Sequence, residues 1–113
     1  MDTIIKNYQT ILSDLLNEYG KLPKSLMPYV KKQIVIDLER NHFQLLSAGW
    51  HNNRYIYQVA FHFAIIDNKI WLLQNNTDLL LADKLVERGV PASDIVLGFL
   101  APDVRSYTGF AAA

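Results

Sequence analysis

The chain opens with apolar residues spaced three and four positions apart, the spacing that places side chains on one face of a helix. The repeat runs from Asp2 to Tyr19 and predicts an amphipathic helix over this range. Asp2 or Thr3 is suited to cap its start, and Gly20 to end it in a left-handed conformation. The apolar face consists of Ile4, Ile5, Tyr8, Ile11, Leu12, Leu15, Leu16 and Tyr19.

The pattern changes after a connector, "KLPKSLMPYVKK", whose two prolines exclude a regular helix. From Gln33 to Asn75, apolar runs alternate with short polar turns at residues 40–41, 51–53 and 67–68. This pattern predicts four strands, "QIVIDLE", "HFQLLSAGW", "RYIYQVAFHFAII" and "KIWLLQ". Loops this short join only antiparallel neighbours, so we expect the strands to form a meander.

The polar stretch "QNNTD" follows the last of these strands, and the helical segment "DLLLADKLVERG" follows in turn. We expect Thr77 or Asp78 to cap this second helix, and Gly89 to lie just beyond its end. "DIVLGFL" predicts a short fifth strand, and "APDVRSYTGFAAA" an irregular tail. The predicted fold is α+β, in a single domain over residues 1–113: N-terminal helix, four-stranded antiparallel meander, second helix, short fifth strand and irregular C-terminal tail.

Tight turns fix strand register, and register decides which side chains share a face of the sheet. One face is predicted to receive both helices, because it collects apolar residues: Ile34, Ile36, Leu38, Phe43, Leu45, Ile56, Ala60, His62, Ala64, Trp71 and Leu73.

The opposite face is more apolar than the exposed side of a one-sided sheet should be. Its aromatic and aliphatic positions in the third and fourth strands are Tyr55, Tyr57, Val59, Phe61, Phe63, Ile65, Ile70 and Leu72. An exposed apolar patch generally marks an interaction surface, so we predict that the chain forms a homodimer, or binds another partner, through these residues. A register error, or coverage by the C-terminal tail, is the alternative interpretation.

Charge and composition exclude several classes of function. The 11 basic and 11 acidic residues cancel, so no overall field would draw the chain onto nucleic acid or an anionic membrane. Local phosphate contacts remain open at Lys21, Lys24, Lys31, Lys32 and Arg105. The absence of Cys excludes thiolate chemistry and fits a reducing compartment. No window approaches the roughly 18 apolar residues of a membrane span, and the N-terminus lacks signal-peptide features. We therefore expect a cytoplasmic protein without membrane contact.

Candidate chemistry is sparse. Asp37, Glu39, His42 and Gln44 would lie together on the second face as a carboxylate and imidazole site. A solvated sheet edge is the simpler interpretation, because no metal-binding spacing such as H-E-x-x-H occurs. His62, in "AFHFA", is expected in the apolar face, either as a core histidine with one hydrogen-bond partner or as a base. No phosphate loop or nucleophile elbow is present, so we predict no catalytic residue, cofactor or metal.

Four stretches, taken in order, resemble the XisI-like family, the fdxN-element excision controlling factors of cyanobacteria: "FQLLSAGW", "KIWLLQNNT", "LADKLVERGVPASDIVLGFLAP" and "YTGFAAA". The resemblance extends over nearly the whole chain, and "GVPASDIVLGF" next to the Trp-bearing "KIW" strand is its most specific part. The chain departs from the family pattern at Asn68, where a hairpin Gly is usual, and at Leu79 and Leu100, where polar residues are common.

The resemblance implies a small α+β regulatory protein. The family is named for its requirement, together with an XisH-type protein, in excision of a DNA element by a separate recombinase during heterocyst differentiation. Our first hypothesis is thus a non-catalytic control factor, a homodimer that engages an XisH-like partner and associates only indirectly with recombinase and DNA. The alternatives are a DNA-binding accessory factor that uses the basic residues above, and a ligand-binding or enzymatic domain centred on His62 or on Asp37, Glu39 and His42.

Overall fold

The computed structural model describes residues 2–21 and 27–113 of the chain. Its elements follow one another as α1 (Asp2–Gly20), β1 (Val30–Asp37), β2 (His42–His51), β3 (Arg54–Ile66), β4 (Lys69–Asn75), α2 (Leu81–Glu87), η1 (Ala92–Asp94), β5 (Ile95–Leu97) and α3 (Pro102–Arg105).

The five strands form one sheet in the order β1-β2-β3-β4-β5. The first four pair antiparallel, whereas β5 runs parallel to β4 because α2 carries the chain back across the sheet. The predicted α+β architecture is confirmed, including the meander, the second helix and the fifth strand. Two details differ: β1 begins at Val30, earlier than expected, and the tail contains the one-turn helix α3.

The two tight hairpin turns have a common backbone conformation. Asn52 and Asn53 join β2 to β3, and Asp67 and Asn68 join β3 to β4. All four residues have positive φ, between 49° and 64°. Two consecutive left-handed residues form a type I′ turn, whose twist matches that of the flanking strands, and Asn and Asp adopt this conformation more readily than other side chains. Asn68 therefore fills the place of the usual Gly without changing the turn.

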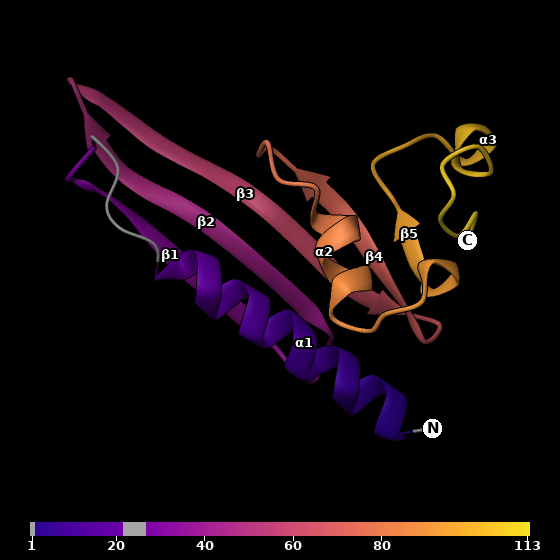
Figure 1. Ribbon diagram of the computed structural model, residues 1–113. Coiled ribbons are helices and arrows are strands. Elements are labelled where there is room, and N and C mark those ends of the chain that lie inside the picture. Colours follow the sequence, from indigo (N-terminus) through magenta and orange to yellow (C-terminus); the bar gives the residue numbers. More distant parts are fainter. Residues whose placement is uncertain (1, 22–26) are drawn as a thin grey trace.

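Both α1 and α2 lie against the same face of the sheet, as Figure 1 shows. We call this the helix face, and its reverse the open face. The core between helices and sheet consists of Tyr8, Leu12, Leu15, Leu16, Phe43, Leu45, Phe61, Phe63, Ile65, Ile70, Leu72, Leu81, Ala82, Leu85, Val90 and Ile95. Within the described part of the chain, no helix is long and apolar enough to cross a membrane.

A β-bulge in β3 determines which side chains reach this core. Leu45 of β2 is opposite Phe61, but the next residue, Leu46, is opposite Val59, so Ala60 has no partner in β2. The carbonyl of Ala60 instead accepts a hydrogen bond from the backbone N–H of Asn76, at 2.7 Å. The extra residue reverses the alternation of side chains along the rest of the strand.

This reversal makes part of the predicted face assignment wrong. Phe61, Phe63, Ile65, Ile70 and Leu72 lie on the helix face and are at most 7% exposed, where we had expected them on the opposite side. Conversely, His62, Ala64 and Trp71 lie on the open face. The predictions for Ile34, Ile36, Phe43, Leu45 and Ile56 were correct, because these residues precede the bulge or lie in strands whose register it does not affect.

Two predicted helix ends were also wrong. Gly20 does not terminate α1 in a left-handed conformation but forms its last helical residue, packed against the side chain of Ile34. The second helix begins at Leu81 with Leu80 as its N-cap and without a side-chain cap. Thr77 instead stabilises the preceding turn, because its hydroxyl oxygen accepts a hydrogen bond from the N–H of Leu79 at 3.1 Å. Gly89 lies beyond α2 with φ of 96°, as expected.

Side-chain contacts also join the helices to the other elements. The hydroxyl of Tyr8 in α1 donates a hydrogen bond to the carboxylate of Asp94 in η1. Burial, together with the hydrogen bond to Asp94, raises the pKa of Tyr8 to about 12. The guanidinium of Arg88, at the end of α2, forms an ion pair with Glu18 of α1.

Candidate functional site

Three large aromatic side chains lie exposed on the open face, near the turn of the β2–β3 hairpin. Trp50, Tyr55 and Tyr57 are 59%, 57% and 64% exposed, and we call them the aromatic patch. Trp50 and Tyr55 are opposite each other in the register, and their rings meet edge to face with centroids 5.4 Å apart. The hairpin carrying them projects beyond the C-terminal end of α1 (Figure 1), so neither helix covers it.

The rows next to the aromatic patch are small or apolar. Tyr57 is opposite Ala48, and Val59 is opposite Leu46. Lys31 of β1 is the outer partner of Ala48, which places an exposed basic side chain in the same row as Tyr57. The open face therefore presents an exposed aromatic surface, and Lys31 borders it in the row of Ala48 and Tyr57.

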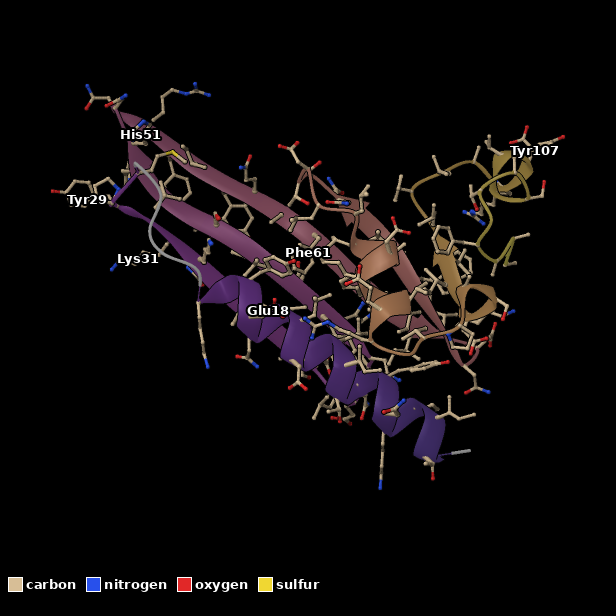
Figure 2. All side chains as sticks on the ribbon, in the orientation of Figure 1. Glu18, Tyr29, Lys31, His51, Phe61 and Tyr107 are labelled. Atoms are coloured by element: carbon tan, nitrogen blue, oxygen red, sulfur yellow. The ribbon has the colours of Figure 1, made fainter. Side chains whose placement is uncertain are left out.

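The predicted interface residues separate into two groups. Tyr55, Tyr57 and Val59 lie on the open face, whereas the other five lie in the core and are not accessible to any partner. The C-terminal tail does not cover the aromatic patch, because Ala111 pairs with Val96 beside β5, at the other edge of the sheet. Figure 2 shows Tyr107 of the tail at the end of the molecule opposite Tyr29, Lys31 and His51.

The predicted phosphate contacts do not form one patch. Lys31 and Lys32 point to opposite faces of β1, and the ammonium group of Lys32 donates a hydrogen bond to the carbonyl of Tyr19 at 3.1 Å. Lys21 is exposed at the end of α1, and Lys24 lies outside the described residues. Arg105 is at the far end of the molecule, where its guanidinium donates to the carbonyls of Gly98 and Leu100 and lies 5.1 Å from the centre of the Trp71 ring.

Two histidines meet on the open face. The Nδ1 of His42 lies 3.1 Å from the Nε2 of His62, and the two rings are tilted by 56°. Both side chains are half-buried. Burial, and next the nearby imidazole of His42, lower the pKa of His62. The sequence does not predict this pair, because regular alternation would place His62 on the helix face, whereas the bulge at Ala60 brings it to the open face.

The predicted carboxylate and imidazole site is present only in part: Asp37 is opposite His42 in the register, but its carboxylate is engaged in the turn that follows β1. The carboxylate of Asp37 accepts hydrogen bonds from the backbone N–H groups of Glu39 and Arg40 at 3.0 and 2.9 Å, so it stabilises the turn after β1. These bonds, with the Arg40 guanidinium, lower the pKa of Asp37. Across residues 2–21 and 27–113, no group of three or more His, Asp or Glu side chains is arranged to hold a metal ion.

A cavity of ≈ 160 Å³ opens beside the start of α2. Most of its lining is apolar, from Leu72, Leu79, Leu80, Leu81, Ala82, Leu97, Phe99 and Phe110, with Asn75 and Asp83 as the polar members. The amide of Asn75 donates to the carbonyl of Leu79, and its oxygen accepts from Thr77, so this side chain is already engaged. The cavity could therefore receive a small apolar group, but its lining does not bring together an acid, a base and a nucleophile.

The chain is similar to proteins whose structures are known. It matches the XisI protein family over residues 1–112. A crystal structure of a XisI-like protein from Anabaena variabilis ATCC 29413 is 43% identical and superposes with a TM-score of 0.91, covering 96% of this chain and 99% of that one.

The fdxN element excision controlling factor XisI from the same organism is 29% identical, with a TM-score of 0.85, and covers 97% of this chain and 99% of that one. No curated protein matches the chain.

Proposed function

Because the chain belongs to the XisI family, we propose that it controls excision of a DNA element, and that it acts by binding other proteins and not by catalysis. The excision role is supported by the similarity to the fdxN element excision controlling factor XisI. The observation that carries protein binding is the aromatic patch, which is exposed on a sheet face that neither helix covers. Large aromatic side chains that remain exposed on a rigid element are typical anchors of protein interfaces.

The partner that we propose is an XisH-like protein, which contacts the aromatic patch from the side of the open face. Tyr and Trp bury a large area and lose little side-chain entropy on binding, so a small number of them can supply most of the affinity. The Trp50 and Tyr55 rings already support each other in the free chain, which reduces the ordering cost further.

Co-purification with an XisH-like protein tests this proposal. We expect the wild-type chain to form a complex at micromolar concentration, and a Tyr55→Ser, Tyr57→Ser variant to bind at least about tenfold more weakly, since two anchors are lost. Tyr107→Ser is the matched control, because Tyr107 is 85% exposed but lies at the opposite end of the molecule. A wild-type chain that forms no complex, or a patch variant that binds as tightly as the control, contradicts the proposal.

A second candidate function is direct contact with nucleic acid. It is favoured by one observation, that exposed Lys31 lies in the same row of the open face as Tyr57. Aromatic rings that stack on bases beside a cation that meets phosphate are typical of single-strand binding. A mobility-shift measurement at low and moderate salt decides this, because phosphate binding weakens steeply with salt. Absence of any shift at low salt eliminates this candidate and leaves the protein-binding proposal intact.

A further inference from the structure

The pair formed by His42 and His62 lies outside the aromatic patch, and its chemistry is independent of the proposed role in excision. We propose that these two imidazoles chelate one late first-row divalent ion, Ni²⁺, Cu²⁺ or Zn²⁺, on the open face of the sheet. Imidazole nitrogen is a preferred ligand of these three ions, whereas Mg²⁺ and Ca²⁺ prefer oxygen.

The geometry of the pair fits a shared ion. The Nδ1 of His42 and the Nε2 of His62 are 3.1 Å apart. If an ion lay about 2.0–2.1 Å from each nitrogen, the N–metal–N angle would be roughly 100°. This angle is between the square-planar and the tetrahedral values. Each neutral ring would then carry its proton on its other nitrogen, Nε2 of His42 and Nδ1 of His62.

The strand register places the two residues in adjacent rows of the same face. His42 is opposite Ala64, whose small side chain leaves room for the imidazole to lean toward His62 one row away. His62 is opposite Gln44 in β2 and Gln74 in β4, so amide side chains border it on both neighbouring strands. A ligand whose position is fixed by the sheet loses little entropy when the ion binds.

A histidine ligates a metal ion only as the neutral imidazole, so both rings must be neutral when the ion binds. Among the described residues, no third His, Asp or Glu joins the pair, so water would complete the coordination of the ion.

Calorimetric titration of the tag-free chain with Ni²⁺, Zn²⁺ and Mg²⁺ tests the site. We expect saturable binding of one Ni²⁺ or Zn²⁺ per chain and none of Mg²⁺. His42→Gln and His62→Gln should each weaken binding by more than the roughly 10–100-fold that loss of an outer-shell partner costs. His51→Gln is the matched control, because His51 lies beside Asn52 at the hairpin turn, away from the pair. This variant should bind the ion as tightly as the wild type does.

The outcomes separate clearly. A stoichiometry of one ion to two chains also supports the pair, with a second copy completing the ligand set, provided that both Gln variants lose it. Absence of Ni²⁺ and Zn²⁺ binding, or binding that survives in both variants, overturns the proposal. Circular dichroism of each variant shows that the fold is kept, and if one variant does not fold, the other decides the result.

Discussion

At the scale of single residues, Gly49 is the glycine at which an added side chain would meet the closest neighbouring atom. It lies in β2 opposite Val30, with φ of 151°. A Cβ added there would lie 1.9 Å from the carbonyl oxygen of Tyr29, which belongs to the backbone and cannot rotate away. This tight approach is where the chain enters β1, so Gly49 permits the edge strand to dock at full length.

We expect Gly49→Ala to lower the free energy of unfolding by roughly 3 kcal/mol, because the overlap forces the two strands apart. The control is Gly109→Ala, since Gly109 also has positive φ but nothing lies within 4 Å of an added Cβ. That substitution should cost only the left-handed strain, about 1 kcal/mol. Urea denaturation of both variants makes the comparison, and equal losses would contradict the steric explanation.

Tyr8 makes the stability of the protein sensitive to alkaline pH. Its pKa is raised from 10.0 to about 12 in the folded chain, so between these values the folded state holds a proton that the unfolded state has lost. The stabilisation is therefore fully present below pH 10 and is lost as the pH rises through 12.

Between pH 10 and 12 we expect the free energy of unfolding of the wild type to fall by roughly 2 kcal/mol more than that of Tyr8→Phe, since the variant lacks this proton. Absorbance at 295 nm gives an independent check, because one tyrosine should titrate near pH 12 in the wild type and be absent in Tyr8→Phe. Identical pH profiles of stability for both proteins would mean that burial and the hydrogen bond to Asp94 do not hold the phenol in its neutral form.

At the scale of elements, β3 is built in two halves that use opposite alternations. Tyr57 and Phe61 are four positions apart, and a regular strand would place them on the same face. The bulge at Ala60 places Tyr57 on the open face and Phe61 in the core, where Figure 2 shows it between the sheet and α1. The same strand thus supplies both the aromatic patch and three core residues, Phe61, Phe63 and Ile65.

Substitution of these two aromatic residues tests the reversal directly. Phe61→Ala should cost about 3–5 kcal/mol of unfolding free energy, because it leaves a cavity among buried side chains. Tyr57→Ala should cost less than about 1 kcal/mol, because Tyr57 is mostly exposed and opposite only Ala48. Chemical denaturation of both variants measures the difference, and a similar cost at the two positions would show that they share an environment.

The elements themselves were predictable from local signals, whereas the faces were not. Both hairpins can be predicted from their turn residues, Asn52–Asn53 and Asp67–Asn68. Few residues other than Asn, Asp and Gly adopt two left-handed conformations in succession. The bulge depends on contacts distant in sequence, such as the bond from Asn76 to Ala60. No local signal marks the bulge, because large apolar residues occupy the odd positions of β3 from Tyr55 to Ile65, on both sides of Ala60, as they would in a regular strand.

The candidate sites were predictable only in part, for the same reason. Tyr55, Tyr57 and Val59 precede the bulge, and their predicted face is the observed one. The proximity of His42 and His62 required the reversal and could not be found from spacing along the chain. Arg105 could not be separated from the lysines without knowing that the tail packs at the opposite end of the sheet.

At the scale of the whole molecule, the two ends differ in character. The chain is elongated, 45 × 30 × 24 Å. The hairpin end carries the aromatic patch, and the other end carries α3 and the tail (Figure 1). Each end contains one tryptophan, Trp50 exposed in the patch and Trp71 half-buried beneath Arg105. This separation makes tryptophan fluorescence a reporter of which end a partner contacts.

We expect the isolated chain to form a homodimer through the aromatic patch at high concentration, because an exposed apolar face self-associates when no other partner covers it. In Trp71→Phe, Trp50 is the remaining reporter, and its emission should shift to the blue as light scattering detects the dimer. In Trp50→Phe, the emission of Trp71 should stay constant. A dimer that forms without any change at Trp50 would place the contact elsewhere on the chain.

The bulge at Ala60 has a further consequence for how the length of this chain can vary. Deletion of Ala60 would remove one small side chain, but it would turn every later side chain of β3 to the opposite face of the sheet. Phe61 and Phe63 would become exposed, and His62 would be buried. We expect a deletion here to abolish folding, and Ala60→Gly, which keeps the residue count, to be tolerated. Relatives that differ in length should therefore gain or lose residues in the hairpin turns, and keep the count from Arg54 to Ile66 unchanged.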